Sequence, residues 1–479
     1  MTSPATIRFI LDGELIEIEN PEPTRTVLQY LREDLRRKGS KEGCAEGDCG
    51  ACTVVLAEVQ NGSRKLKAIN SCIQFLPTLD GKELITVESL GADGKLHPVQ
   101  QAMLEHHGSQ CGFCTPGFIM SLYALYESNP TPGRAEIDDA LAGNLCRCTG
   151  YRPIIAAAKA MSTYARPAVR KSNVALQDLS RESSLHINHA GQQFFAPRST
   201  EELVNVLAQY PDATILAGGT DIGLWVTKQH RELGNIVYTG RVTELAAANV
   251  TSSSIEVGAA APLTDVVPLI VEHYPGLDEM FRRFASPPIR NAGTLGGNIA
   301  NGSPIGDSMA ALLVLDTALT LVSKSGERQI ALTDFYHDYM VNDLQPGEVV
   351  ARIDIPLPAN AATVTSHKWS KRFDQDISAV CNAYRLELLD GHVRSFKMAC
   401  GGLAATVKRA SATETVLNGA AWEAASIELA CDALAQDFAP ISDMRASAEI
   451  RLHVAQNLLR RFFAETNDSE LATVYNYGR

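Results

Sequence analysis

The chain has 479 residues, of which 45% are hydrophobic and 20% charged, as in soluble globular proteins, and this length predicts about three or four domains. Its 43 lysines and arginines and 55 aspartates and glutamates give a net charge of -12. This charge argues against a nucleic acid partner, because phosphate binding needs a basic face. The longest apolar run, 309–315, is too short to span a membrane, and the N-terminus lacks a signal-peptide pattern. We expect a cytoplasmic protein without membrane contact.

Residues 1–90 are predicted to form a β-rich domain. Apolar residues alternate over 7–11, Asp12-Gly13 favours a tight turn, and the apolar residues of 15–18 return as a second strand. A helical pattern over 27–35 then leads into a glycine-rich stretch, 43–50. This order predicts a small sheet with one helix and a loop wrapped around a bound group.

Residues 91–165 are predicted to form a bundle of four helices. The pattern turns helical at His97, and Thr115 is expected to cap a helix with Pro116 in its first position. Two further helices are expected near 136–141 and 153–164. The polar segment 166–190 has no strong periodicity and is interpreted as an interdomain linker.

The second half of the chain predicts two more domains. Over 191–360, short strands alternate with helices at 201–209 and 307–315, which indicates an α/β domain. Over 361–479, two antiparallel strands meet at Asp390-Gly391 and three helices follow. The fold class expected for the whole chain is therefore multidomain α+β.

Eight of the eleven cysteines lie before residue 150 and divide into two sets. The spacing C-x4-C-x2-C with a fourth, later cysteine is that of plant-type 2Fe-2S sites. The intervening glycines let the loop bend and point amides at the sulfurs. The alternative, a zinc site with four cysteines, usually shows two C-x2-C pairs, and this stretch has one. This first set is Cys44, Cys49, Cys52 and Cys72.

The second set is Cys111, Cys114, Cys146 and Cys148. Its members are expected on loops between the predicted helices. Their spacing alone leaves open both a zinc site and a second iron-sulfur cluster. The three remaining cysteines, Cys381, Cys400 and Cys431, are scattered and are interpreted as small buried hydrophobic residues.

Two glycine-rich segments lie in the α/β domain. In the segment 216–222, LAGGTDI, a strand runs into a turn whose backbone amides can bind a pyrophosphate. The segment 290–300, RNAGTLGGNIA, is followed by GSPIGD at 302–307. Either segment alone is a weak signal, since neither is G-x-G-x-x-G, but two in one domain predict a dinucleotide site.

Longer strings around these motifs resemble the molybdenum hydroxylase family. GSQCGFCTPG (108–117) and GNLCRCTGYRP (143–153) are similar to its second 2Fe-2S domain. The two glycine segments resemble the FAD domain shared by xanthine dehydrogenases and carbon monoxide dehydrogenase flavoproteins. The resemblance runs along essentially the whole chain. It implies a β-grasp ferredoxin-like domain, a four-helix 2Fe-2S domain, an α/β FAD-binding domain, and a C-terminal α+β domain like that of the carbon monoxide dehydrogenase flavoprotein.

The resemblance implies a 2Fe-2S cluster at each cysteine set, with Gln110 and Cys148 facing a pterin; for Gln110 the alternative is loop packing. For Phe284 and Val350, core packing is the alternative to flavin contact, and for Lys368 it is a surface salt bridge. The implied FAD contacts are Ile215, Leu216, Ala217, Gly218, Gly219, Thr220, Asp221, Ile222, Phe284, Thr294, Leu295, Gly296, Gly297, Asn298, Asp307, Val350 and Lys368.

The implied activity is that of the small subunit of bacterial xanthine dehydrogenases. Electrons from a partner chain's molybdopterin would pass through the second cluster, the first cluster and FAD to NAD, with two copies of each chain assembled. No catalytic residue is expected here, since hydroxylation belongs to the partner. Tyr-Met-Val-Asn-Asp at 339–343 replaces a more basic stretch common in relatives, which bears on NAD as acceptor. The alternatives are an aldehyde or N-heterocycle hydroxylase, or a free-standing diaphorase.

Overall fold

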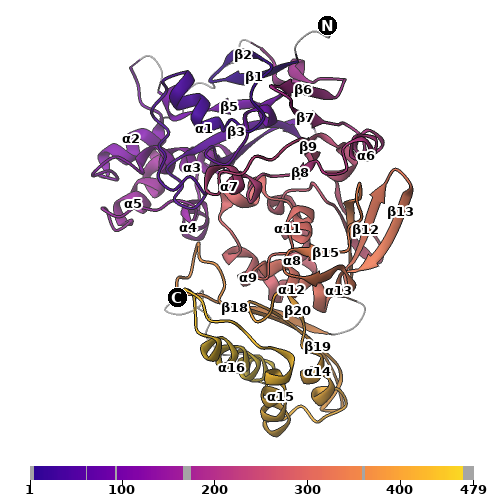
Figure 1. Cartoon of the computed structure of the whole chain (residues 1–479). Helices are drawn as coiled ribbons and strands as arrows, with labels where there is room; N and C mark the ends of the chain where they lie inside the picture. Colours follow the sequence, from indigo (N-terminus) through magenta and orange to yellow (C-terminus); the bar gives the residue numbers. More distant parts are fainter. Residues whose placement is uncertain (1–4, 61, 92–93, 166–173, 359–361, 468–479) are drawn as a thin grey trace.

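The computed structural model describes residues 5–467 except 61, 92–93, 166–173 and 359–361. The described chain is mixed α and β, with several separate sheets. The N-terminal sheet lies at the top of Figure 1, with the helical domain beside it, the middle domain below and the C-terminal domain at the bottom. The multidomain α+β fold class expected from the sequence is confirmed.

The N-terminal domain is a five-stranded sheet of order β2-β1-β5-β3-β4. The predicted hairpin is present, and Asp12 and Gly13 at its turn have φ of 54° and 90°. Ile7 and Phe9 point into the core and are fully buried. The elements are β1 (Thr6–Leu11), β2 (Glu14–Glu19), α1 (Val27–Gln29), a π-helical turn (Tyr30–Asp34), β3 (Thr53–Gln60), β4 (Ser63–Asn70) and β5 (Glu83–Ile85).

The helical domain contains α2 (Pro98–Glu105), α3 (Thr115–Ser128), α4 (Arg134–Leu141) and α5 (Arg152–Ala160). The start of α3 differs from the prediction by one residue. Cys114 occupies the N-cap position, Thr115 is the first helical residue, and Pro116 lies within the first turn. The reason is that the Thr115 hydroxyl donates to Ser109 Oγ, 2.8 Å away, instead of capping the helix.

The linker expected over 166–190 must be shortened at its C-terminal end. Leu185–His189 forms strand β6, which pairs antiparallel with β7 (Gln192–Ala196). Its buried side chains, Leu185 and Ile187, join a hydrophobic core that also contains Phe9 and Phe75 of the N-terminal domain. This common core fixes the N-terminal and middle domains against each other. Residues 166–173 lie outside the described part.

The middle domain has two main sheets, of order β6-β7-β9-β8 and β10-β11-β16-β12-β13 (Figure 1). Its strands after β7 are β8 (Thr214–Leu216), β9 (Ile236–Tyr238), β10 (Ala248–Val250), β11 (Ser254–Gly258), β12 (Ala318–Ser323), β13 (Gly326–Ala331), β14 (Tyr336–Asp338), β15 (Val341–Asn342) and β16 (Val349–Pro356). Its helices are α6 (Thr200–Gln209), α7 (Ile222–Thr227), α8 (Leu263–His273), α9 (Asp278–Arg283), α10 (Pro287–Ala292), α11 (Leu295–Asn301), α12 (Asp307–Val314) and α13 (Leu332–Phe335).

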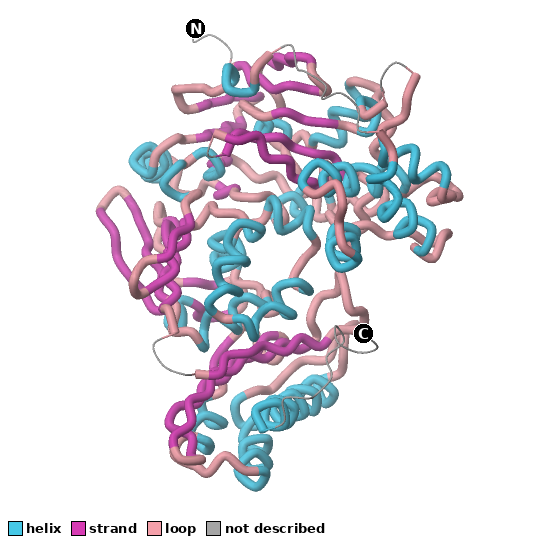
Figure 2. The backbone as a smooth tube through the Cα atoms, turned by 180° about the vertical axis from the view of Figure 1, so that it is seen from behind, coloured by secondary structure: helices cyan, strands magenta, loops and turns pink. Residues whose placement is uncertain are grey.

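The C-terminal domain packs three helices against a four-stranded antiparallel sheet, seen from behind in Figure 2. Tyr384 and Phe462 stack at its centre with ring centroids 4.6 Å apart. The elements are β17 (Thr363–Trp369), β18 (Val380–Leu389), β19 (His392–Gly401), β20 (Lys408–Arg409), α14 (Ser411–Leu417), α15 (Ala424–Asp437) and α16 (Ala448–Asn467).

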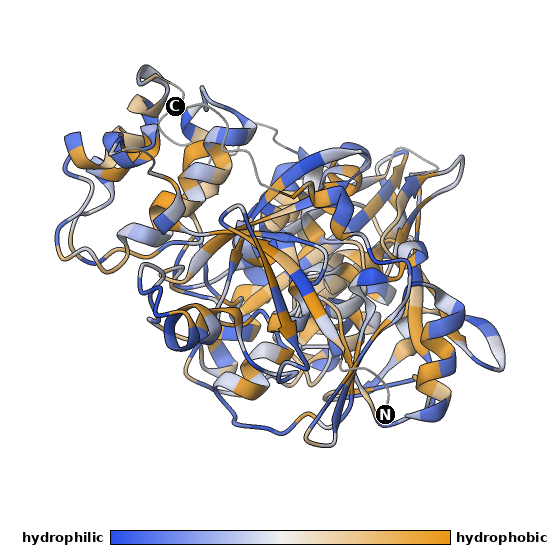
Figure 3. Ribbon diagram, turned by 90° about the horizontal axis from the view of Figure 1, so that it is seen from above, coloured by the Kyte–Doolittle hydropathy of each residue, from blue (hydrophilic) through white to orange (hydrophobic). Residues whose placement is uncertain are grey.

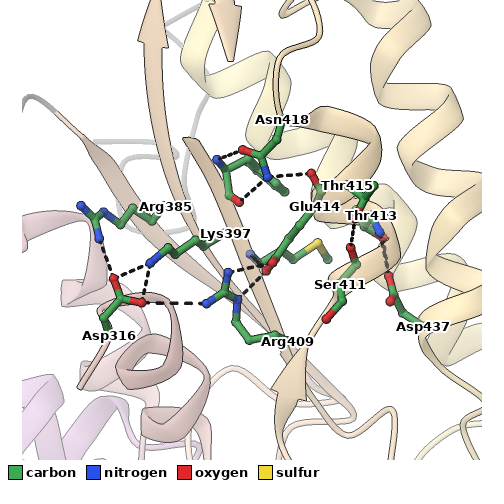
Figure 4. A network of polar contacts seen from close by, with 12 residues as sticks. Asp316, Arg385, Lys397, Arg409, Ser411, Thr413, Glu414, Thr415, Asn418 and Asp437 are labelled. Atoms are coloured by element: carbon green, nitrogen blue, oxygen red, sulfur yellow. Dashed lines mark hydrogen bonds and ion pairs between the residues drawn. The ribbon is translucent and has the colours of Figure 1, made fainter. Parts of the chain in front are cut away.

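A charged network joins this domain to the middle one (Figure 4). Asp316, just after α12, pairs with Arg385 on β18, Lys397 on β19 and Arg409 on β20. Arg409 also pairs with Glu414 of α14. One carboxylate of the middle domain therefore contacts three strands of the C-terminal sheet.

Hydrophobic residues run along the strands and inner helices, and hydrophilic residues colour many of the surrounding loops (Figure 3). Cys381 and Cys400 are buried in the C-terminal sheet, and Cys431 is buried on α15, which confirms their interpretation as core residues. None of the helices in the described ranges combines the length and the apolar character that crossing a membrane requires.

Candidate cofactor sites

The first cysteine set lies beside the N-terminal sheet. Cys44 and Cys49 are on the loop between the π-helical turn and β3, whereas Cys52 and Cys72 lie next to the ends of β3 and β4 and are 1% and 3% exposed. The thiols form two pairs. The Cys52 and Cys72 sulfurs are 3.2 Å apart, and the Cys49 thiol hydrogen-bonds the Cys44 sulfur.

The surroundings of Cys44 favour a thiolate. The Cys49 thiol and the backbone amides of Cys49, Glu46 and Asp48 donate hydrogen bonds that lower the pKa of Cys44 to about 5, although partial burial opposes them. The Cys49 backbone amide lies 3.3 Å from the Cys44 sulfur. Thiolate is the form that binds iron, and within this pair the shared hydrogen bond favours it at Cys44 while raising the pKa of Cys49.

The second set lies on loops between helices, as predicted. Cys111 and Cys114 lie between α2 and α3, and Cys146 and Cys148 between α4 and α5. Again the thiols pair, Cys111 with Cys148 and Cys114 with Cys146. Cys111, Cys148 and the preceding Gln110 are exposed, so this set reaches the protein surface.

The paired arrangement fits two-iron clusters. In a 2Fe-2S group each iron takes two protein ligands, whereas a structural zinc ion draws four ligands to one centre. Within the described residues, no three His, Cys, Asp or Glu side chains gather around a single ion position. Each set instead supplies two adjacent pairs of sulfur ligands, which is the donor set of such a cluster.

The two sets are joined directly through their loops. The Leu145 backbone amide donates to the Cys49 carbonyl at 3.0 Å. The buried Asn144 side chain donates to the Gly50 carbonyl at 3.1 Å and accepts from the Ser121 hydroxyl at 2.6 Å. Gly50 has φ of 68°, and a Cβ there would overlap the Gly143 carbonyl oxygen. This contact requires glycine, and the two loops form one packed unit.

A cavity of 660 Å³ lies between the glycine-rich segments of the middle domain. Gly218 packs so closely against the Ala292 carbonyl that a Cβ would overlap it. The turn at Gly218 leads into α7, and Thr294 caps α11 by accepting a hydrogen bond from the Gly297 amide at 3.0 Å. Two helix N-termini and glycine backbone without side chains therefore border the cavity. Backbone amides in such an arrangement favour an anionic pyrophosphate.

Most of the residues that the sequence assigned to FAD line this cavity. They are Ile215, Ala217, Gly218, Gly219, Thr220, Asp221, Ile222, Phe284, Thr294, Gly296, Gly297, Asn298 and Val350. The size of the cavity and its two glycine-rich walls fit a flavin dinucleotide. Phe284 and Val350 therefore face the cavity as well as packing against the core.

Four of the assigned residues lie behind the lining of this cavity. Leu216 and Leu295 are buried in the hydrophobic core. The Lys368 amine donates to the Asp307 carboxylate at 2.8 Å, and both side chains are at most 3% exposed. The salt-bridge alternative for Lys368 is thus present, but it is buried. Ser378 also donates to Asp307, so this pair anchors the segment that follows β17.

The sequence did not single out several cavity-lining residues. Trp225 and Ile289 line the cavity without any motif of their own, and Ile377, in the loop after β17, lines it as well. Ser303 and Ile305 also line it, and their position directly after the second glycine segment was the available signal. Met340 comes from the 339–343 stretch, which places the tip of the β14–β15 hairpin at the cavity.

The loop of the first cysteine set also contacts two segments that line the cavity. The Thr227 hydroxyl, at the end of α7, donates to the Ala45 carbonyl at 2.7 Å. Gln375, two residues before Ile377, donates to the Asp48 carbonyl at 2.7 Å. Sequence reasoning missed both contacts, since the partners are 182 and 327 residues apart.

Four family models match the chain in consecutive segments. They are the 2Fe-2S iron-sulfur cluster binding domain (9–74), the [2Fe-2S] binding domain (86–159), the FAD binding domain in molybdopterin dehydrogenase (188–358) and the CO dehydrogenase flavoprotein C-terminal domain (365–466). Each cysteine set falls in one of the two iron-sulfur domains or at its edge, and the cavity falls in the FAD domain. The chain is an iron-sulfur and FAD-binding member of the molybdenum hydroxylase family.

Other molybdenum hydroxylases are similar over most of this chain. Xanthine dehydrogenase of Emericella nidulans is 31% identical over 90% of the chain, and aldehyde oxidase 1 of Bos taurus is 28% identical over 98%. The chain spans only 36% and 40% of the length of these two relatives. The expected 2Fe-2S, FAD and molybdenum hydroxylase character is confirmed.

Solved structures of the family agree with the fold. The crystal structure of quinoline 2-oxidoreductase from Pseudomonas putida 86 is 26% identical to this molybdenum hydroxylase chain. The match has a TM-score of 0.52 and covers 56% of this chain and 94% of the other. The likeness therefore extends to a relative that carries a different substrate in its name.

Proposed function

We propose that this chain is the electron-transfer part of a xanthine dehydrogenase. In this proposal it receives electrons from a partner chain that binds molybdopterin and delivers them to NAD, in a heterotetramer with two copies of each chain. The proposal goes beyond the family assignment in four respects: the substrate, the acceptor, the partner and the assembly.

The order of the three sites in space carries this proposal. The second cysteine set reaches the surface at Cys111 and Cys148, and the first set lies behind it, joined by the bond from Leu145 to Cys49. The first set in turn contacts Thr227 of α7, a helix whose residues Ile222 and Trp225 line the cavity. A surface site, a half-buried site and a cavity in direct succession are what sequential electron transfer needs.

The residues of the chain have holding and orienting roles in this proposal. The first cysteine set would hold one cluster and the second set the other, each through two thiol pairs. The turn at Gly218 would leave backbone amides free for a pyrophosphate. When bound, the clusters supply one-electron transfer and the flavin links it to two-electron chemistry. No side chain is assigned as a general base, because hydroxylation would occur on the partner.

The surface around the second set supports a partner there. Gln110, Cys111 and Cys148 are exposed, and Phe113 is 46% exposed beside them. An exposed aromatic ring next to exposed cluster ligands is suited to burial in an interface. We therefore place the molybdopterin-bearing partner against this surface.

The substrate and the acceptor rest on the relatives. The xanthine dehydrogenases among them support a purine, and aldehyde oxidase and quinoline 2-oxidoreductase supply the alternatives, an aldehyde or an N-heterocycle. Met340 lines the cavity, and Tyr339, Met340 and Val341 of the same hairpin are 62%, 44% and 51% exposed. The acceptor would approach this apolar hairpin tip rather than a basic one.

The proposal is tested by purifying the chain with the proteins that accompany it and assaying several substrates. We expect NAD reduction with xanthine or hypoxanthine by the complex and none by this chain alone. Turnover of an aldehyde or an N-heterocycle without xanthine turnover would contradict the purine assignment. A lone monomer that oxidises NADH and associates with no molybdenum protein would instead support the diaphorase alternative.

A further inference from the structure

One peptide group of the first cysteine loop is hydrogen-bonded at both ends. Gln375 Nε2 donates to the Asp48 carbonyl at 2.7 Å. The N–H of the same peptide group belongs to Cys49 and faces the Cys44 sulfur at 3.3 Å. In a trans peptide the C=O and N–H point in opposite directions. Gln375 therefore binds the carbonyl of the peptide group whose N–H donates to the Cys44 sulfur.

A second peptide group has a similar arrangement. The Thr227 hydroxyl donates to the Ala45 carbonyl at 2.7 Å, and the N–H of that peptide group belongs to Glu46. The Glu46 amide is another hydrogen-bond donor to Cys44. Lys228 adds a contact to the Cys44 carbonyl at 3.1 Å, but its side chain is 45% exposed, so solvent screens its charge.

Both supporting side chains belong to segments that line the flavin cavity through neighbouring residues, Trp225 for Thr227 and Ile377 for Gln375. Thr227 is the last residue of α7, which begins at the glycine turn. Gln375 lies in the loop after β17, and its backbone carbonyl accepts a hydrogen bond from the Arg372 guanidinium at 2.7 Å. The Arg372 backbone amide in turn donates to the Asp376 carboxylate at 2.8 Å. Hydrogen bonds within this loop hold its conformation. The Gln375 side-chain amide therefore reaches Asp48 from a structured segment.

We propose that Thr227 of the FAD-binding domain and Gln375 of the C-terminal domain are positioning residues that set the reduction potential of the first iron-sulfur cluster. They do so by polarising two amide groups that donate to the Cys44 sulfur. The inference rests on the proposed function for the presence of the cluster. Linked hydrogen bonds strengthen one another, and hydrogen bonds to sulfur are a main determinant of cluster potential.

The direction of the effect follows from charge. Reduction adds one negative charge to the cluster, and amide donors stabilise that charge. Removal of either supporting side chain should weaken the donors and lower the potential of the first cluster. Within the described residues, neither side chain hydrogen-bonds a residue of the second cysteine set, so the potential of the second cluster serves as an internal reference.

The experiment is an anaerobic redox titration followed by EPR on the full chain with its accompanying partner. Gln375→Met and Thr227→Val remove the donors at nearly constant size, and Thr227→Ser restores the hydroxyl. Gln229→Met, at an exposed residue just after α7, is the matched control for Gln375→Met. We expect the equilibrium constant for reduction of the first cluster to fall about twofold to tenfold in the first two variants, where tenfold equals about 59 mV. Thr227→Ser and Gln229→Met should match the parent.

An unchanged first-cluster potential in either donor variant that retains the cluster signal and the flavin would overturn the inference for that residue. If one donor variant loses the EPR signal of the first cluster, the potential measured in the other donor variant decides. Thr227→Ser must in that case show the parent potential. If the unmodified chain shows no pair of 2Fe-2S signals, the proposed function fails instead. The two failures are thus distinguishable.

Discussion

The backbone amide of Leu145 donates to the carbonyl of Cys49 at 3.0 Å, so the residue before Cys146 is bonded directly to a member of the other cysteine set. The adjacent Asn144 side chain reinforces this contact through Gly50. The relative position of the two sets is therefore determined by hydrogen bonds between their own loops. Changes in these bonds should alter both sites together.

The first prediction concerns Asn144. Asn144→Ala leaves the Ser121 hydroxyl and the Gly50 carbonyl buried without this partner, which should cost about 1–3 kcal/mol. Urea unfolding measures the loss, and EPR should show a changed magnetic interaction between the clusters. Asn129→Ala, a change at a half-buried asparagine just beyond α3, is the control and should leave the EPR spectrum as it is. Parent-like stability of Asn144→Ala would contradict the role of this side chain.

The second prediction separates the two cysteine sets. Cys72→Ser should remove the first 2Fe-2S signal and keep the second, whereas Cys148→Ser should do the reverse, because the sets share no thiol. Iron analysis should show a loss of about two irons in each variant. Cys400→Ala, in the core of the C-terminal sheet, should retain all the iron. Loss of both signals in either serine variant, with the fold intact, would contradict two independent sites.

The third prediction concerns the glycine turn. Gly218→Ala places a Cβ on the Ala292 carbonyl and should force the two glycine segments apart. We expect FAD loss with both iron-sulfur signals retained, measured by flavin absorbance after gel filtration. Gly133→Ala is a matched control, since a Cβ there meets only the flexible end of Glu136 at 3.5 Å. Full FAD content in Gly218→Ala would contradict a role of this turn in FAD binding.

The fourth prediction compares a buried and an exposed ion pair. Lys368→Met leaves the Asp307 carboxylate buried without its cation and should cost about 3–5 kcal/mol, with little dependence on salt. Asp316→Ala removes a carboxylate that is 45% exposed and should cost about 1 kcal/mol, less at high salt (Figure 4). Unfolding at low and high ionic strength measures both. Equal costs would contradict the assigned difference in burial.

Local chemistry explains which features the sequence predicted. The cysteine spacing, the Asp12-Gly13 turn and the glycine segments require particular residue types at short separations, so each leaves a pattern in the chain. The strand Leu185–His189 was assigned to the linker because it is short and follows a polar stretch. Its alternation of buried and exposed side chains becomes meaningful only beside β7.

Contacts between distant segments explain what the sequence missed. Nothing near Gln375 indicates that its amide meets Asp48, 327 residues away. Lys368 and Asp307 were assigned to FAD one by one, and their mutual pairing depends on how β17 packs against α12. Such contacts follow from the packing of domains rather than from any local pattern.

The central claim is that this chain holds two iron-sulfur clusters and a flavin on one path toward a molybdenum partner. The most direct test is metal and flavin analysis of the anaerobically purified chain with its accompanying proteins, with EPR after dithionite reduction. The account predicts two distinct 2Fe-2S signals with about four irons and one FAD per chain, and molybdenum only in the presence of a second polypeptide. Zinc in place of iron at Cys111, Cys114, Cys146 and Cys148, or a chain without flavin, would contradict it.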